Sequence, residues 1–287
     1  MTETRDDFYR RYYQTERGAL WAKGHIGNKN PFLNILLEAR AMISIVGKRQ
    51  RFFKKVFGKD RDKLILDLGC GGGHELFTRY GRVIGADLES APLACAKNIY
   101  SSVIRADITA LSFEDNTFDY IVSSDVIEHI RAEDKDNLLS EIYRVLKKGG
   151  KTAHALETKS DNFLYRFAQK YPALFQKSFV EEIGGHFGLE MPEDALNRFK
   201  KCNFKLIGME KIWGFVWSTE EYIYRFDNEY KDKSALIKLL VAVCKILNKN
   251  IVVHAAANVL LGILNYFVES LRPLSRAQGI LVAYQKS

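Results

Sequence analysis

The chain has 287 residues, of which 47% are apolar and 12% aromatic, enough to bury a substantial core. Its N-terminus is charged and lacks the apolar stretch of a secretory signal, and its four cysteines lie far apart without metal-binding spacing. These features argue against a secreted, disulfide-bonded or zinc-finger protein, so we expect a cytoplasmic protein with reduced thiols.

The net charge of +8 at pH 7 is concentrated in residues 1–63, which hold fifteen Lys and Arg against seven Asp and Glu. A basic region can meet an anionic membrane, a nucleic acid or a phosphorylated substrate. The alternative is an ordinary solvated helix face. The charge alone does not separate these functions.

Apolar residues at helical spacing predict an N-terminal helical region over residues 1–62. Five short apolar runs follow and predict buried parallel strands, at 63–70, 82–89, 102–108, 118–126 and 151–158. Helical spacing at 91–100 and 134–148 separates some of these runs, and the second helix is expected to stop at Gly149-Gly150. Alternating strands and helices predict a doubly wound sheet.

The later part of the chain is mostly helical. A helix is expected over 192–204, with Pro192 in its first turn, and strands over 204–215 and 279–286. We therefore predict an α/β fold, with a Rossmann-like sheet that has helices on both faces, N-terminal helices, and a helical insertion before the last strand. The regions are 1–62, 63–215 completed by 279–287, and the insertion 216–278.

The strongest motif comes directly after the first strand, where Asp67 precedes glycines at 69, 71 and 73. Such a turn lets the backbone approach a ligand at the carboxyl end of a strand. A dinucleotide-binding fold would place its third glycine at 74, but that residue is His74. The motif therefore favours a different nucleoside cofactor over NAD.

Two further carboxylates extend this site. Asp87 is expected to end the second strand, where it can accept hydrogen bonds from ribose hydroxyls. Asp107 is expected to end the third strand, where it can accept from an adenine amino group. Each aspartate alone could be a helix cap or a turn residue, but three in order after the glycine turn indicate a nucleoside-binding row.

The motifs LDLGCGGG, VIGADLE, RADITALSFEDNTFDYIVSSDVIEHI and LLSEIYRVLKKGG occur in this order. Over residues 63–158 the chain resembles the class I S-adenosylmethionine (SAM)-dependent methyltransferases, in particular the type 11 group related to ubiquinone-pathway methyltransferases. The resemblance implies SAM as cofactor, S-adenosylhomocysteine as product, and an antiparallel pair of final strands. It also implies a set of cofactor-binding residues, comprising Asp67, Gly69, Cys70, Gly71 and Gly73 at the methionine end, Asp87 and Leu88 at the ribose, Asp107 and Ile108 at the adenine, and Ser124 beside the cofactor.

The sequence departs from two classes of relatives. After the fourth strand it has neither the Asn/Asp-Pro-Pro-aromatic motif of amino methylation nor the Pro-Cys pair of cytosine C5 methylation. Methyl transfer is an in-line displacement, so a base is needed only when the acceptor must lose a proton. The candidates are His129, which is the best placed, His154, Glu157 and His186.

Asp125, Glu128 and His129 together could hold a divalent cation. The alternative is that Asp125 caps a helix and His129 only packs, and we expect no metal. His186 lies in a glycine-containing loop that could close over a substrate or form a surface turn.

The insertion is unusually apolar. Residues 231–249 predict a basic amphipathic helix with Lys231, Lys238, Lys245 and Lys249 on one side. Residues 251–268 predict a more apolar helix with a stripe of His254, Asn258 and Asn265, which makes a simple membrane span unfavourable. The insertion is a lid, a dimer interface or a membrane-interface element.

The sequence thus predicts a SAM-dependent methyltransferase for a small-molecule, lipid-linked or glycan acceptor, with O-methylation favoured. The alternatives are an RNA methyltransferase and a non-catalytic scaffold that keeps the cofactor fold. We expect no nucleic-acid partner. Peripheral contact with the inner face of the membrane and homodimerisation stay open.

Overall fold

The computed structural model describes residues 45–181, 185–212, 217–269 and 271–287. Most of the N-terminal region predicted as helical, residues 1–44, lies outside them. The described part of that region contains helix α4 (Ile45–Phe57), as the apolar spacing predicts. Helix α4 packs its phenylalanines into the core, because Phe52, Phe53 and Phe57 are almost fully buried.

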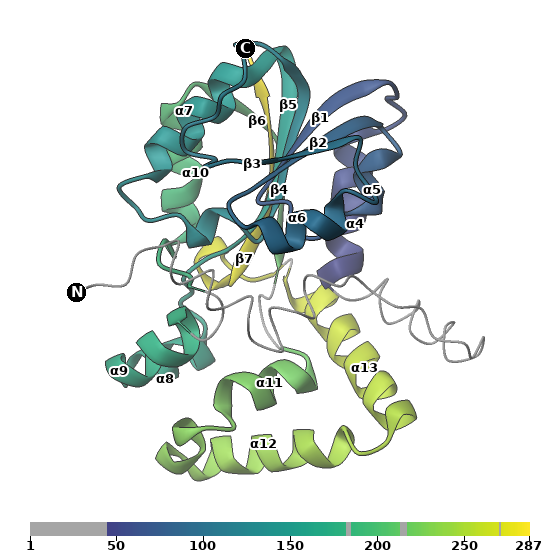
Figure 1. The fold of residues 1–287 in the computed structure, drawn as a ribbon. Coiled ribbons are helices and arrows are strands. Elements are labelled where there is room, and N and C mark those ends of the chain that lie inside the picture. The colour runs from purple at the N-terminus through teal and green to yellow at the C-terminus, as the bar shows by residue number, and fades with distance from the viewer. Residues whose placement is uncertain (1–44, 182–184, 213–216, 270) are drawn as a thin grey trace.

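A seven-stranded sheet forms the centre of the fold, in the order β3-β2-β1-β4-β5-β7-β6 (Figure 1). All neighbouring strands are parallel except at β7, which runs antiparallel to both β5 and β6. The pairing of the last two strands agrees with the predicted antiparallel pair. The strands are β1 (Lys63–Leu68), β2 (Gly81–Asp87), β3 (Ser102–Arg105), β4 (Phe118–Ser124), β5 (Leu146–Glu157), β6 (Phe204–Ile212) and β7 (Gly279–Lys286).

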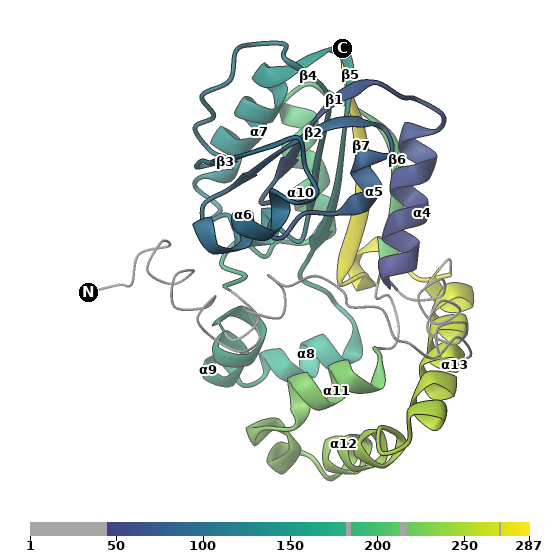
Figure 2. The same cartoon turned by 45° about the vertical axis from the view of Figure 1, so that its right-hand side comes forward.

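Helices cover both faces of this sheet and create two apolar cores (Figures 1 and 2). One core joins the sheet to α4, α5 (Glu75–Thr78) and α6 (Ser90–Ala96). The other joins it to α7 (Lys135–Val145) and α10 (Pro192–Lys201). Alternate residues of one strand enter opposite cores: Ile65 packs in the first and Leu66 in the second. The fold class predicted from the sequence is therefore confirmed.

The predicted end of helix α7 is wrong. The helix stops at Val145 rather than at Gly149-Gly150, and β5 begins at once with Leu146. Leu146 is fully buried and pairs with Phe118 of β4. An apolar residue at this place fits a helix and a strand equally well, so the periodicity could not show the change. The glycines instead lie within β5, where Gly149 has φ +75°.

A second helical layer lies beyond the carboxyl ends of the parallel strands (Figures 1 and 2). It comprises α8 (Phe163–Gln169), α9 (Pro172–Phe175), a π-helical turn (Gln176–Glu181), α11 (Thr219–Phe226), a 3-10 turn (Glu229–Lys233), α12 (Ala235–Leu247) and α13 (Ile251–Glu269), and another 3-10 turn (Leu274–Arg276) follows.

This helical layer has a core of its own, which differs from the predicted division of the chain. Tyr165 and Phe179, placed by the prediction in the SAM-binding region 63–215, pack with Phe226 and Ile237 of the insertion. Aromatic side chains from both segments contact one another in this core, for example Phe179 and Phe226, whose ring centroids are 6.2 Å apart. Such contacts between distant segments leave no trace in sequence periodicity, so the border at 215/216 could not reflect them.

The predicted single basic helix over 231–249 is also divided. Lys231 belongs to the 3-10 turn, and Ser234 begins α12 by accepting a hydrogen bond from the Ile237 backbone N–H at 3.5 Å. Lys231 and Lys245 both pair with Asp227. The extended backbone of Ser234 therefore interrupts the lysine row that a continuous helix would carry.

Helix α13 places its polar stripe against α11. Asn258 Oδ1 accepts a hydrogen bond from the Thr219 backbone N–H at 2.9 Å, and His254 Nε2 lies 2.6 Å from Glu220 Oε1. Within the described part of the chain, one helix, over Val252–Glu269, is long and apolar enough to cross a membrane, and 17% of that window is buried. Asn258 and His254 of the predicted polar stripe thus make contacts within the protein.

Candidate active site

The glycine turn after β1 has the backbone shape that only glycine adopts easily. Gly69, Gly71 and Gly73 have φ values of +59°, +51° and +85°. A Cβ at Gly69 would lie 2.6 Å from Val126 Cγ2, so a side chain is excluded there on steric grounds as well. Cys70 donates its N–H to the Ala86 carbonyl at 3.1 Å, which joins the turn to β2.

Asp87 holds this turn at the end of β2. Its carboxylate accepts hydrogen bonds from the backbone N–H groups of Gly71, at 2.8 Å, and Glu89, at 3.0 Å. Burial raises the pKa of Asp87 above its ordinary value. The predicted position at the end of the second strand is confirmed, and the carboxylate is fixed beside the glycine turn.

Asp67 is linked to the same turn through a tyrosine that the sequence reasoning missed. The Tyr100 hydroxyl donates to Asp67 Oδ2 at 2.5 Å and accepts from the His74 backbone N–H at 2.6 Å. Burial raises the pKa of Asp67 to about 7, against the opposing effect of the Tyr100 hydrogen bond. The only hint in the sequence was a tyrosine at the end of the segment 91–100, directly before the third strand.

The adenine end of the predicted row lies beyond β3. The strand stops at Arg105, so Asp107 follows it by two residues instead of ending it. Its carboxylate accepts from Thr109 through the backbone N–H at 2.9 Å and the hydroxyl at 2.8 Å. Leu88 offers its carbonyl to Arg105 Nε, and Ile108 is buried in the core. Since β1, β2 and β3 are neighbours, the three aspartates follow one edge of the sheet.

Ser124 ends β4 and lies beside an ion pair. Asp125, with φ +57°, binds the Arg49 guanidinium of α4 through both carboxylate oxygens. Arg49 Nη1 also lies 3.5 Å from Ser124 Oγ. The suggested cation site of Asp125, Glu128 and His129 is therefore wrong in one member, because Asp125 is used to hold α4 against the strand end.

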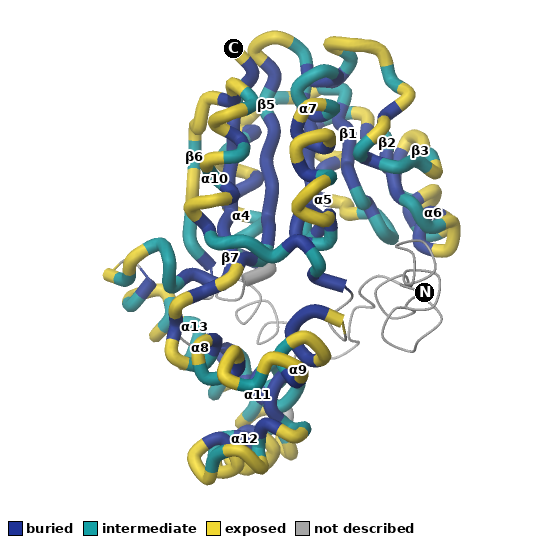
Figure 3. The backbone as a smooth tube through the Cα atoms, turned by 90° about the vertical axis from the view of Figure 1, so that its left-hand side faces the viewer, coloured by how far each residue is buried: buried dark blue, intermediate teal, exposed yellow. Residues whose placement is uncertain are grey.

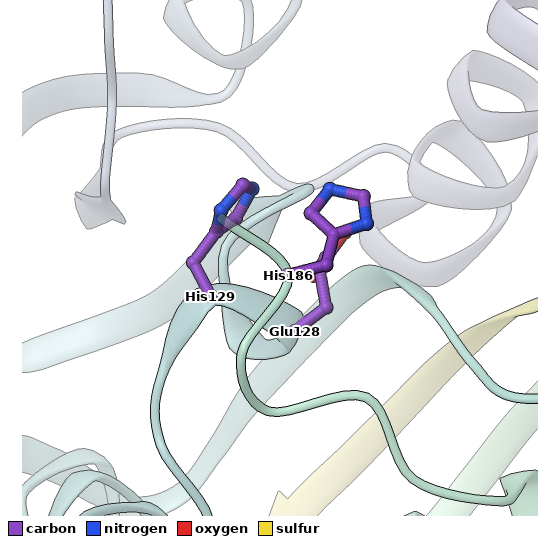
Figure 4. Close-up of side chains that lie close together, drawn as sticks. All are labelled: Glu128, His129 and His186. Carbon is purple, nitrogen blue, oxygen red and sulfur yellow. The ribbon is translucent and has the colours of Figure 1, made fainter. Parts of the chain in front are cut away.

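A different residue joins the other two. Glu128, His129 and His186 offer atoms that lie within 4.8 Å of one another (Figure 4). The first two lie in the 3-10 turn Ile127–His129, and His186 comes from the loop before α10. The rings of His129 and His186 meet nearly at right angles, with centroids 4.6 Å apart. Carboxylate and imidazole groups so arranged could hold a divalent cation or relay a proton.

Glu157 at the end of β5 organises this cluster. One of its carboxylate oxygens lies 3.4 Å from His186 Nδ1 and 3.5 Å from Arg225 Nη2. Its backbone N–H donates to Glu128 Oε1 at 3.2 Å. Thus the predicted residues His129, His186 and Glu157 converge, and Glu128 and Arg225 complete the group.

The charges of the cluster are set by burial and by neighbouring ions. Burial disfavours ionised Glu157, but the charges of His186 and Arg225 outweigh it and lower the pKa of Glu157 to about 2. Burial likewise opposes charge on His186, and the Glu157 carboxylate outweighs it, so the pKa of His186 is raised. Burial, aided by the charge of Asp125, raises the pKa of Glu128 to about 8.

His154 does not belong to this site, and its selection as a base is wrong. The ring is fully buried in the sheet, where Nδ1 hydrogen-bonds with Ser123 Oγ at 2.8 Å and Nε2 with Thr152 Oγ1 at 2.6 Å. Burial lowers its pKa to about 3. Both nitrogens are occupied, and no acceptor could reach them.

Comparison with known proteins agrees with this geometry. Residues 66–153 match the family model described as "Methyltransferase domain". The chain is similar to phosphoethanolamine N-methyltransferase 2 of Caenorhabditis elegans, with 36% identity over 58% of this chain and 41% of that protein. It is also similar to the ubiquinone/menaquinone biosynthesis C-methyltransferase of Escherichia coli, with 32% identity over 36% of this chain and 45% of that protein. The matched regions thus span less than half of these relatives.

Among solved structures, the fold is similar to geranyl diphosphate C-methyltransferase from Streptomyces coelicolor, which was determined with Mg²⁺, geranyl diphosphate and S-adenosylhomocysteine. The TM-score is 0.59 with 13% sequence identity, and the match covers 100% of both chains. At this level of identity the structural similarity supports the fold alone. The family assignment rests on the sequence match over residues 66–153. Over residues 66–153 the chain carries a methyltransferase domain of the type 11 group of class I SAM-dependent methyltransferases.

Proposed function

We propose that the protein transfers a methyl group from SAM to a small-molecule or lipid-linked acceptor. The observation that carries this proposal is the hydrogen bond from the Gly71 backbone to Asp87, which sets a left-handed glycine turn against a carboxylate at the neighbouring strand end. Bound SAM would supply an electrophilic methyl group. The residues described here would bind it and orient the acceptor.

The surroundings of the turn support room for a cofactor. A Cβ built at Gly71 meets no atom of the described residues within 4 Å. Asp87 would accept from the ribose hydroxyls and Asp107 from the adenine amino group, while Asp67 and Tyr100 keep the turn in place. Cys70 and Ile108 would contribute backbone and apolar contacts rather than side-chain polar groups.

The cluster beyond β4 and β5 supports deprotonation of a hydroxyl acceptor. His129 is half-buried, whereas His186 and Glu128 are buried behind it. We assign His129 as the group that takes the proton, and His186 with Glu157 as the pair that positions its ring. O-methylation follows from this assignment, although the two curated relatives carry N- and C-methyltransferase names.

A metal would have a different role. Glu128, His129 and His186 could bind a divalent cation, which would orient an anionic or hydroxyl-bearing acceptor. We nevertheless propose metal-free transfer, because Glu157 and Arg225 already provide charges that orient the imidazole of His186.

The RNA alternative loses part of its support. It rested on the basic N-terminal region, but Arg49 binds Asp125 and Lys48 binds Glu269 and the Lys211 carbonyl. These two side chains serve internal contacts within the described part of the chain. A small acceptor also accords with the named substrates of relatives, a phosphoethanolamine and a geranyl diphosphate.

The test is transfer of labelled methyl from SAM by the purified full chain into an extract of its source cells. The products are separated into organic, aqueous and macromolecular fractions. We expect label in the organic or aqueous fraction and none that is sensitive to ribonuclease. Ribonuclease-sensitive label would favour the RNA alternative, and SAM binding without transfer to any fraction would favour the scaffold.

A further inference from the structure

Helix α12 exposes an apolar face on the side away from the protein. Its buried residues Ile237, Val241 and Cys244 pack in the core of the helical layer. On the opposite side stand four exposed apolar residues, here called the α12 outer face: Leu236, Leu239, Val243 and Ile246, with 62%, 61%, 43% and 63% of their surface exposed. A helix packed on one side normally carries polar residues on the other. This one does not.

The position of α12 leaves this face open to a large partner. Figures 1 and 2 both show α12 as the helix farthest from the sheet, and Figure 3 shows exposed residues along it. The exposed Val252 and Val253 continue the apolar surface into the first turn of α13. The corner between the helices is fixed, because Thr219 donates its hydroxyl to Asn248 Oδ1 at 2.6 Å.

The charged residues of α12 itself have one sign. The segment Ala235–Leu247 contains no acidic residue. Lys238 and Lys249 are exposed, and at 100° per residue they lie with Lys245 along one edge of the apolar row. Lys245 also pairs with Asp227. An apolar row with a lysine edge fits a lipid surface, where apolar side chains enter the acyl boundary and lysines meet anionic headgroups.

A second copy of the chain fits this face less well. A two-fold dimer through the α12 outer face would bring the same patch of each subunit together, including both lysine edges. No acidic residue of α12 could then neutralise them. An anionic bilayer supplies the missing negative charge.

Insertion across the membrane is disfavoured by the contacts of α13. Asn258 and His254 hold it against α11, and Glu269 pairs with Lys48 of α4. These contacts would have to break before α13 could leave the protein. Attachment therefore leaves the helical layer intact and uses only its surface.

From these observations we infer that the α12 outer face docks the protein on the surface of a bilayer that contains anionic lipids. This inference is independent of the proposed methyl transfer, because it concerns binding alone. Docking would bring the helical layer to the lipid while the sheet stays in water.

The test is flotation of the full-length protein with vesicles of phosphatidylcholine, with and without phosphatidylglycerol. We expect binding to the phosphatidylglycerol vesicles to be stronger by about 30-fold, since Lys238 and Lys249 each add about 1 kcal/mol near an anionic surface. High salt should remove most of this preference. The double variant Leu239→Glu/Ile246→Glu should lose binding to both kinds of vesicle.

The matched control is Leu206→Glu. Leu206 is also an exposed apolar residue, at 46%, but it lies on β6, away from the helical layer. This variant should float like the wild type, and circular dichroism should show that every variant is folded. Equal flotation of the double variant and the wild type would overturn the inference. A second outcome would also overturn it: wild-type protein that forms a dimer in light scattering but does not float with vesicles, together with a double variant that is monomeric.

Discussion

His186 Nδ1 lies 3.4 Å from a carboxylate oxygen of Glu157, and this contact joins the loop before α10 to the end of β5. Both side chains are largely buried, so the pair is screened from water. The ring of His186 then contacts His129 edge to face. The Glu157 carboxylate, the buried His186 imidazole and the more exposed His129 imidazole therefore contact one another in that order.

Removing the half-buried imidazole of His129 should affect turnover more than binding. We expect His129→Ala to reduce kcat by about 10²-fold with a hydroxyl acceptor and to change KM little, because general bases typically contribute this much. Steady-state kinetics on the identified acceptor would measure it. His254→Ala is the control, since that histidine lies on α13 and pairs with Glu220. A tenfold higher KM with normal kcat would contradict the assignment.

The positioning role of Glu157 should appear in the pH profile. The pKa of His186 is raised because the charge of Glu157 outweighs burial, so Glu157→Gln should lower the pKa of His186. If His129 and His186 act together in proton transfer, the part of the pH profile of kcat that reflects their ionisation should shift to lower pH. An unchanged profile, with only a loss of stability, would leave Glu157 a purely structural role.

Asp87→Ala should weaken S-adenosylhomocysteine binding by about tenfold or more, because the variant loses an acceptor for the ribose and frees the Gly71 N–H. Isothermal titration calorimetry would measure the affinity. Asp115→Ala is a matched control, since Asp115 is 68% exposed and its partner Arg144 keeps a second partner in Glu141. Equal affinity in the Asp87 variant and the wild type would refute the cofactor site.

Tyr100→Phe should cost about 1–3 kcal/mol of unfolding free energy, because the Asp67 carboxylate and the His74 N–H would lose a shared hydroxyl partner. Urea unfolding would measure this loss. Tyr284→Phe provides the comparison, because the buried Tyr284 hydroxyl has no hydrogen-bond partner among the described residues. Similar losses in both variants would show that the bridge contributes nothing specific.

Glu128→Gln should stabilise the protein increasingly as the pH rises. The pKa of Glu128 is raised from 4.5 to about 8, so ionisation favours the unfolded chain between these values. The penalty is absent below about pH 4.5, grows as the pH rises towards 8, and then stays constant. The difference in Tm between variant and wild type should therefore be larger at pH 8 than at pH 5. A difference in Tm that does not depend on pH would mean that the pKa of Glu128 is not raised in the folded protein.

Much of the proposed cofactor site could be predicted from the sequence because its information is local. The glycines at 69, 71 and 73 need left-handed backbone, and the aspartates follow apolar runs. The shared helical core, the Arg49–Asp125 pair and the role of Tyr100 arise from contacts between residues far apart in the chain. Periodicity within one segment does not contain such pairings.

The proposed acceptor site was partly predictable for the same reason. His129, His186 and Glu157 were chosen for their chemistry near predicted strand ends, and they do converge. Arg225, however, reaches Glu157 from α11, and nothing in its local sequence indicates that a side chain of helix 219–226 contacts the end of β5. His154 was chosen by the same criterion as the others and failed, because its place within β5 faces the core.

The position of β7 has a consequence for synthesis of the protein. This strand lies between β5 and β6, and residues 280–283 are fully buried, yet it follows the whole helical layer in the chain. While the ribosome is still making residues 158–278, the apolar edge of β5 has no partner. The nascent chain therefore exposes one unpaired edge of β5 for roughly 6–24 seconds at ordinary elongation rates of about 5–20 residues per second, and chaperone contact is expected at that stage.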